Sequence, residues 1–172
     1  MIITMLTMDN QDIKNQVKKI TKSIFKDIVK IRRWIHKHPE LSFEEKKTSE
    51  YICKILEKNN IQFQSGFAGY GVVALIKCNN PNSQVVGLRA DMDALPIQEK
   101  NNIDYKSIND GVMHACGHDV HTAILLGTAI VLNKLKDNLK GTIKFIFQPA
   151  EEKLPGGASL MIQEGVLLNP KI

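Results

Sequence analysis

Hydrophobic residues recur at helical spacing over the N-terminal third of the chain. An apolar side chain returns every three or four positions over residues 11–38, which predicts a helix that Pro39 cannot continue. A second helix is predicted over residues 42–59, where Ser42 followed three positions later by Glu45 has the spacing of a capping box. The apolar positions of the first helix are Ile13, Val17, Ile20, Ile24, Ile28 and Ile31.

The pattern changes beyond residue 60 to short β-branched runs separated by glycine, asparagine and proline, which predicts strands and turns. The turn at 79–83 makes residues 85–88 the strand that returns after 72–76. Because apolar residues occupy both faces of these strands, we expect a sheet that is covered on both sides. The elements predicted after the second helix are strands at 61–64, 72–76 and 85–88, a helix at 122–135, a strand at 142–147 and a short helix at 157–163.

This order of elements predicts the α/β fold class, as a layered domain in which helices flank a mixed sheet. A chain of 172 residues is long enough to bury one substantial core. We expect residues 1–10 to be a frayed N-terminus, with Met1 and Met8 both open as the initiator, and residues 11–172 to form a single folded unit.

Composition and charge exclude several classes of protein. The net charge is +5, but the lysines are scattered among acids without interleaved aromatic residues, so we expect no nucleic-acid partner. The apolar start is too short for a signal peptide or a membrane span, and we expect no membrane partner. Cys53, Cys78 and Cys116 lack the spacing of a disulfide framework, which indicates a reducing, cytoplasmic setting.

The densest chemistry lies in residues 114–121, which hold three of the five histidines, one cysteine and one aspartate. Thiolate and imidazole groups this close together are typical of a transition-metal site. Cys116 and His118 can both face one site only if the backbone between them is irregular, which Gly117 permits. A thiolate can bridge two cations, and His118 can bind a metal through one ring nitrogen while a carboxylate orients the other.

Two acidic loops follow predicted strands, where ligands usually bind in an α/β sheet. Asp91 and Asp93 follow one strand, and either is available to orient His118. In the second loop, one of the adjacent carboxylates of Glu151 and Glu152 can bind a cation while the other stays free as a general base. A solvated acidic turn would be the simpler interpretation of a Glu–Glu pair alone, but this pair directly follows a buried strand.

Other polar residues near these loops receive more ordinary roles. His121 stays open between binding substrate and capping or packing the helix, and Arg89 is predicted to pair with Asp91. A further group could form the wall of a pocket, but the end of an amphipathic helix is the simpler explanation for its residues, which are Trp34, His36 and His38.

The motifs together resemble a known family, the metal-dependent amidohydrolases that include aminoacylases, hippurate hydrolases and auxin-conjugate hydrolases. They occur in the order of that family and cover roughly residues 28–166. No single motif decides the resemblance, but the set is highly specific. The matching segments are residues 33–43, 88–96, 113–123, 147–152 and 156–158.

The resemblance implies a zinc-peptidase-like domain with two divalent metal ions, zinc or manganese. It implies that Cys116, His118 and Glu152 are metal ligands, that Glu151 is the general base, and that Asp93 supports the site. The implied reaction is hydrolysis of a small N-acyl amino acid to its acid and amino acid. The implied assembly of the full-length form is a homodimer.

The chain departs from the family at its C-terminal end, where no histidine follows His121. Family members continue with a further histidine ligand, a lid and dimerisation domain and a last histidine ligand. We therefore expect an N-terminal part of the catalytic domain, incomplete at its C-terminus and exposing an apolar sheet edge. Three protein ligands shared by two metals leave each cation underbound, so we expect this chain alone to be inactive or nearly so. Hydrolysis by residues 1–172 at an ordinary enzymatic rate would refute this.

Two other functions remain open at this stage. One is a non-catalytic metal-binding or oligomerising remnant with the same fold, which would bind metal without turnover. The other is a thiol-dependent hydrolase that uses Cys116 with His114 or His118, and such an enzyme should survive a chelator.

Overall fold

The first described element is a long N-terminal helix. The computed structural model describes residues 9–172. Residues 1–8, which include most of the predicted frayed start and both candidate initiators, lie outside the described residues, whereas Asp9 and Asn10 already belong to the start of the first helix. Helix α1 spans Asn10–Lys37 and begins where the Asp9 carboxylate accepts a hydrogen bond from the Asp12 N–H at 2.7 Å. It ends ahead of Pro39, as predicted.

The predicted order of helices and strands is confirmed along the described chain, with boundaries that differ by a few residues. The third helix begins four residues earlier than predicted, because Gly117 adopts a left-handed conformation (φ 84°) that lets the helix start at His118. The elements after α1 are α2 (Lys46–Lys58), β1 (Gln62–Phe67), β2 (Gly71–Lys77), β3 (Val85–Asp91), α3 (His118–Leu135), the short 3-10 helix η1 (Lys136–Asn138), β4 (Thr142–Gln148) and α4 (Gly157–Gln163).

The four strands form one mixed sheet in the order β1-β2-β4-β3. Strand β2 pairs antiparallel with β1 and β4, whereas β3 pairs parallel with β4. The returning strand β3 therefore does not pair with β2, because β4 lies between them. The parallel register places Asp91, the last residue of β3, opposite Gln148, the last residue of β4.

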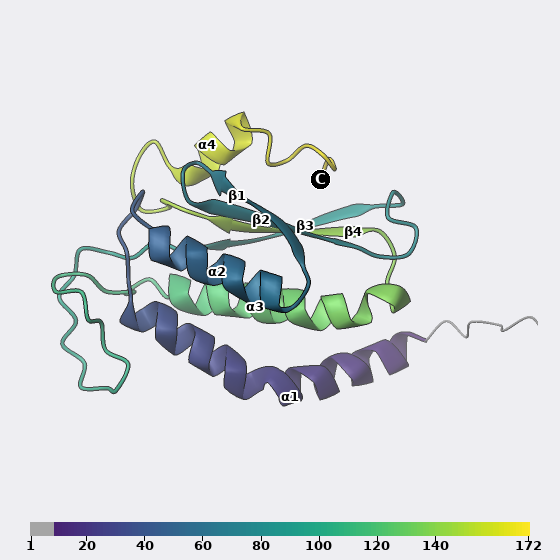
Figure 1. Ribbon diagram of the computed structural model, residues 1–172, viewed down its shortest axis with the longest axis horizontal. Helices are drawn as coiled ribbons and strands as arrows, with labels where there is room; N and C mark the ends of the chain where they lie inside the picture. Colours follow the sequence, from purple (N-terminus) through teal and green to yellow (C-terminus); the bar gives the residue numbers. More distant parts are fainter. Residues whose placement is uncertain (1–8) are drawn as a thin grey trace, which may run out of the picture.

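Helices cover the two faces of the sheet unequally (Figure 1). On one face α2 and α3 pack on the sheet and α1 packs on α3, around a core that includes Ile35, Leu126 and Phe145. On the other face the short helix α4 forms a smaller cluster. The expected cover on both faces is thus met for β2 and β4 but is wrong for the two outer strands, because β1 is mostly exposed and β3 is only partly buried.

The predicted capping box at the start of the second helix is wrong. Helix α2 begins at Lys46, and Glu45, at its N-cap position, makes no side-chain capping hydrogen bond. The Ser42 hydroxyl instead donates to Asp93 at 2.6 Å, and the buried Glu45 carboxyl accepts from the Ala150 N–H at 2.7 Å. Both side chains therefore bind partners that are distant in sequence, in loops that leave the sheet.

None of the helices within residues 9–172 combines the length and the apolar composition needed to cross a bilayer.

Candidate metal centre

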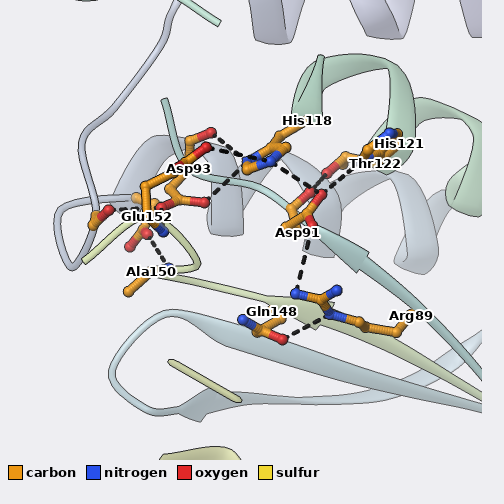
Figure 2. Close-up of polar contacts among 11 residues, drawn as sticks. Arg89, Asp91, Asp93, His118, His121, Thr122, Gln148, Ala150 and Glu152 are labelled. Carbon is orange, nitrogen blue, oxygen red and sulfur yellow. Dashed lines mark hydrogen bonds and ion pairs between the residues drawn. The ribbon is translucent and has the colours of Figure 1, made fainter. Parts of the chain in front are cut away.

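Three segments that carry metal-type side chains meet at one edge of the sheet (Figure 2). Strands β3 and β4 run parallel, so the loops that follow them leave from the same edge. Asp91 and Asp93 lie where β3 ends, Glu152 lies in the loop after β4, and α3 begins at His118. Figure 2 shows His118 between Asp93 and Glu152 on one side and Asp91 and His121 on the other.

The imidazole of His118 is oriented by Asp93. Its Nδ1 lies 3.1 Å from Asp93 Oδ1 and 3.0 Å from the Asp93 carbonyl oxygen. With Nδ1–H donating to Asp93, Nε2 is free to bind a cation, and it lies 3.8 Å from Glu152 Oε1. Burial disfavours the charged imidazole, but the hydrogen bond to Asp93 and the negative charge of Asp91 outweigh it and raise the pKa of His118.

Asp93 also accepts hydrogen bonds from the other segments of the site. Its Oδ2 accepts from the Ser42 hydroxyl at 2.6 Å and from the Glu152 N–H at 3.0 Å. Burial opposes its negative charge, but these donors and His118 hold the pKa of Asp93 well below its ordinary value. Asp93 is therefore a fixed carboxylate that joins the two loops and the start of α3.

One group of side chains can hold a cation: ligand atoms of Cys116, His118 and Glu152 lie within 4.8 Å of one another. These are the three ligands that the resemblance implies. Hydrogen bonding to Glu152, burial and the surrounding carboxylates raise the pKa of Cys116 to about 11. Since this keeps the thiol protonated at neutral pH, it disfavours the thiol-hydrolase hypothesis, whereas a cation would stabilise the thiolate as a ligand.

A second group consists of Asp91, His118 and His121, whose ligand atoms also lie within 4.8 Å of one another. It shares His118 with the first group. The half-exposed His121 has its Nδ1 2.7 Å from Asp91 Oδ1. Arg89 lies 3.4 Å from Asp91 Oδ2, and its Nε donates to Gln148 at 2.7 Å, which confirms its predicted structural pairing. Arg89 offsets part of the charge of Asp91, which disfavours cation binding by this group.

The two adjacent glutamates face different surroundings. The carboxylate of Glu152 belongs to the first group, with an oxygen within reach of Cys116 and His118. Glu151 is exposed, belongs to neither group, and contributes negative charge at Cys116. This arrangement gives one carboxylate for a cation and one free carboxylate beside it.

A buried network behind the site was missed by the sequence reasoning. His36 of α1 lies 2.8 Å from Asp119 Oδ2 through Nδ1 and 3.2 Å from Glu99 Oε1 through Nε2. Arg32 adds an ion pair to Asp119 at 2.7 Å. A helix end explains the position of His36 but not its partners, which lie 63 and 83 positions away. The one sequence feature that pointed to this network was the position of Asp119, directly after the candidate ligand His118.

His114 and Trp34 lie outside both candidate cation groups. His114 is buried, neither ring nitrogen has a hydrogen-bond partner, and burial lowers its pKa to about 4. It belongs to neither metal-type group. The Trp34 ring stacks on His38 and on Tyr51, which confirms a packing role for this end of α1.

Comparison with known proteins identifies relatives of the chain. Residues 87–172 match the sequence profile described as Peptidase family M20/M25/M40. The chain is 46% identical over 154 residues to an N-acyl-L-amino acid amidohydrolase of Geobacillus stearothermophilus, covering 90% of this chain and 41% of that protein. It is 48% identical over 141 residues to an N-acetylcysteine deacetylase of Bacillus subtilis, covering 81% of this chain and 37% of that protein.

A solved structure shares the fold of this chain. The chain superimposes on a dinuclear metal-binding peptidase of family M20 from Bacillus subtilis with a TM-score of 0.80 and 46% sequence identity. That match covers 85% of this chain and 41% of the other. The chain thus spans about two fifths of the length of the relatives that it matches.

Proposed function

Because the chain belongs to Peptidase family M20/M25/M40, we propose that it serves in metal-dependent hydrolysis of the amide bond of N-acyl amino acids. The observation that carries this proposal is the convergence of Cys116, His118 and Glu152 within 4.8 Å, beside the free carboxylate of Glu151. The names of two relatives, an N-acyl-L-amino acid amidohydrolase and an N-acetylcysteine deacetylase, support this substrate class. We further propose a cytoplasmic setting and a homodimeric full-length form.

The donor set fits divalent cations. A thiolate, an imidazole with its other nitrogen held by Asp93 and a carboxylate are the donors that zinc accepts, and manganese shares the nitrogen and oxygen donors. In this proposal Cys116, His118 and Glu152 would hold the two cations. When bound, they supply Lewis-acid polarisation of the amide carbonyl and of the attacking water.

The residues of the chain then divide the remaining work. Glu151 accepts a proton from the water as its oxygen bonds to the carbonyl carbon, and passes that proton to the nitrogen as the C–N bond breaks. Asp93 keeps His118 Nε2 directed at the site. The products are a carboxylic acid and a free amino acid.

A second candidate function is a non-catalytic metal-binding unit with the same fold. The observation that favours it is that the first group offers only three protein ligands among the described residues, too few for two fully coordinated cations. Both candidates require metal binding at the same residues. They differ in turnover, since only the enzyme hydrolyses an N-acyl amino acid when loaded with metal.

A cobalt titration of the 172-residue chain tests the site, because cobalt replaces zinc and reports thiolate ligation in its absorption spectrum. Cys116→Ser should remove the thiolate-to-cobalt band, and Glu152→Gln should weaken binding at least about tenfold. Glu151→Gln should keep the cobalt affinity of the unsubstituted chain while abolishing turnover in a catalytically complete form.

Matched variants identify the cation group that is used. Cys53→Ser removes a thiol outside both groups and should change nothing. His121→Asn should leave the titration unchanged if the first group holds the cation. Loss of binding in His121→Asn with retention in Cys116→Ser would overturn the assignment in favour of the second group. Loss of metal in Glu151→Gln with retention in Glu152→Gln would mean that the two glutamates have exchanged roles.

A further inference from the structure

Glu45 is a completely buried carboxyl group (0% exposed) that lies outside both candidate cation groups. Its Oε1 accepts a hydrogen bond from the Ala150 N–H at 2.7 Å, across 105 positions of sequence. Its Oε2 has no hydrogen-bond partner. Glu45 therefore has one strong contact, and that contact is with the residue immediately before Glu151.

Ala150 adopts a backbone conformation that is unusual for a residue with a side chain. Its φ is 48°, in the left-handed region, where alanine is disfavoured and needs support from its surroundings. The support reaches both of its polar groups, because its N–H donates to Glu45 and its carbonyl accepts from the Gly157 N–H at 2.7 Å. The turn that directs the chain into Glu151 and Glu152 is thus held from two sides.

We propose that Glu45 is a positioning residue, which fixes the left-handed turn at Ala150 and thereby sets the directions of the Glu151 and Glu152 carboxylates. The inference rests on the proposed function for the roles of those two carboxylates. A second contact also supports the loop after β4, because one oxygen of Asp93 accepts hydrogen bonds from both the Ser42 hydroxyl and the Glu152 N–H. The segment 42–45 therefore supports the loop after β4 directly at Ala150, through Glu45, and indirectly at Glu152, through Ser42 and Asp93 (Figure 2 shows Ala150 beside Glu152).

The role requires a hydrogen-bond acceptor and does not require a charge. Burial raises the pKa of Glu45 to about 7, so the neutral form is well populated at neutral pH. A glutamine keeps an acceptor oxygen at the same reach, whereas a methionine fills similar space without a strong acceptor. The pair of variants separates the contact with Ala150 from the volume that Glu45 occupies.

The test compares Glu45→Met and Glu45→Gln in the 172-residue chain by amide hydrogen exchange and cobalt titration. In Glu45→Met the Ala150 amide should exchange at least about tenfold faster relative to the Phe145 amide of β4, because its acceptor is gone. Cobalt affinity should fall about 10- to 100-fold, the usual loss when a group that orients a ligand is removed. Glu45→Gln should restore both values to within about threefold of the unsubstituted chain.

Thr142→Val is the matched control, because it removes a buried hydrogen bond, to the Pro81 carbonyl, at the opposite end of β4. It should lower stability but leave Ala150 exchange and cobalt affinity unchanged. Unchanged Ala150 protection in Glu45→Met, or lost protection with unchanged cobalt affinity, would overturn the proposal. If the unsubstituted chain binds no cobalt, the proposed function fails, and the exchange rate at Ala150 still decides whether Glu45 fixes the turn.

Discussion

Two buried carboxyl groups near the candidate metal centre have pKa values that shift in opposite directions. Burial opposes the charge of both Asp93 and Glu45. Asp93 receives hydrogen bonds from His118, Ser42 and the loop amide of Glu152, and these hold its pKa low. The backbone N–H groups around Glu45 do not offset burial, the negative charge of Asp93 opposes ionisation as well, and the pKa of Glu45 rises to about 7. Hydrogen bonding, burial and neighbouring charge together therefore decide the charge of each carboxyl at neutral pH.

Glu45 should make stability depend on pH. Its pKa is raised from 4.5 to about 7, so the folded chain holds the proton more tightly than the unfolded chain does. Its contribution is therefore fully present below about pH 4.5 and is lost as the pH rises towards 7, by up to about 3 kcal/mol. Urea unfolding of the unsubstituted chain and of Glu45→Gln at several pH values measures this. The stability difference should move in favour of the glutamine variant as pH rises, and a difference independent of pH would contradict the assignment.

Strand β4 carries a buried lysine on the face opposite the large core. Lys144 is 1% exposed, and its Nζ donates to the carbonyl oxygens of Val166, Leu168 and Pro170, each at 2.8 Å. These carbonyls belong to the irregular segment that follows α4. Lys144 thus binds that segment to the sheet at three carbonyl groups, on the face where α4 alone is too short to cover it.

Lys144→Met should loosen this segment without changing the metal centre. The methionine keeps much of the apolar volume but leaves three carbonyl groups without their donor, at a cost of about 2 kcal/mol. Thermal melting should report the loss, while the cobalt affinity stays that of the unsubstituted chain. Lys134→Met, which removes an exposed lysine of α3, is the control and should change stability by less than about 0.5 kcal/mol. Equal stability of the two variants would show that the three contacts contribute nothing.

Across the whole molecule, the outermost helix is tied to the candidate metal centre by a buried ionic network. Asp119 in the first turn of α3 binds both Arg32 and His36 of α1. His36 also forms an ion pair with Glu99, in the loop between β3 and α3. The hydrogen bond to Asp119 outweighs burial and raises the pKa of His36. Helix α1, the start of α3 and the loop that carries Glu99 are distant in sequence, and this network joins them next to His118.

Asp119→Asn should destabilise the fold, because it removes the buried negative charge that Arg32 and His36 share. The expected loss is about 3 kcal/mol, typical of breaking a buried pair by removing one partner. Asp27→Asn is the control, since Asp27 and Lys30 form a surface pair 3.5 Å apart and are mostly exposed. Urea unfolding should place the control within about 0.5 kcal/mol of the unsubstituted chain. A similar small change in Asp119→Asn would contradict the role of the network.

The sequence alone was sufficient to predict the helices and strands, the mixed sheet and the family. The spacing of apolar residues, and the glycine, asparagine and proline residues that separate the elements, are local properties of the sequence. Each element is set mainly by which of its own positions are apolar. The resemblance to a known family implied Cys116, His118 and Glu152 as ligands, whereas the chemistry of the residues alone left open which of Glu151 and Glu152 binds the cation. The structure brings those three side chains together.

The tertiary structure decided which residues meet. Strand β4 enters between β2 and β3, although no local pattern distinguishes that order from a hairpin of β2 and β3. Ser42 and Glu45 have the spacing of a helix cap, yet they bind Asp93 and Ala150, which lie 51 and 105 positions away. A buried polar group takes the partner that satisfies it in the folded chain, and long-range packing determines that partner. The sequence determined the elements and the candidate ligands, while the folded chain determined how those ligands are oriented and held.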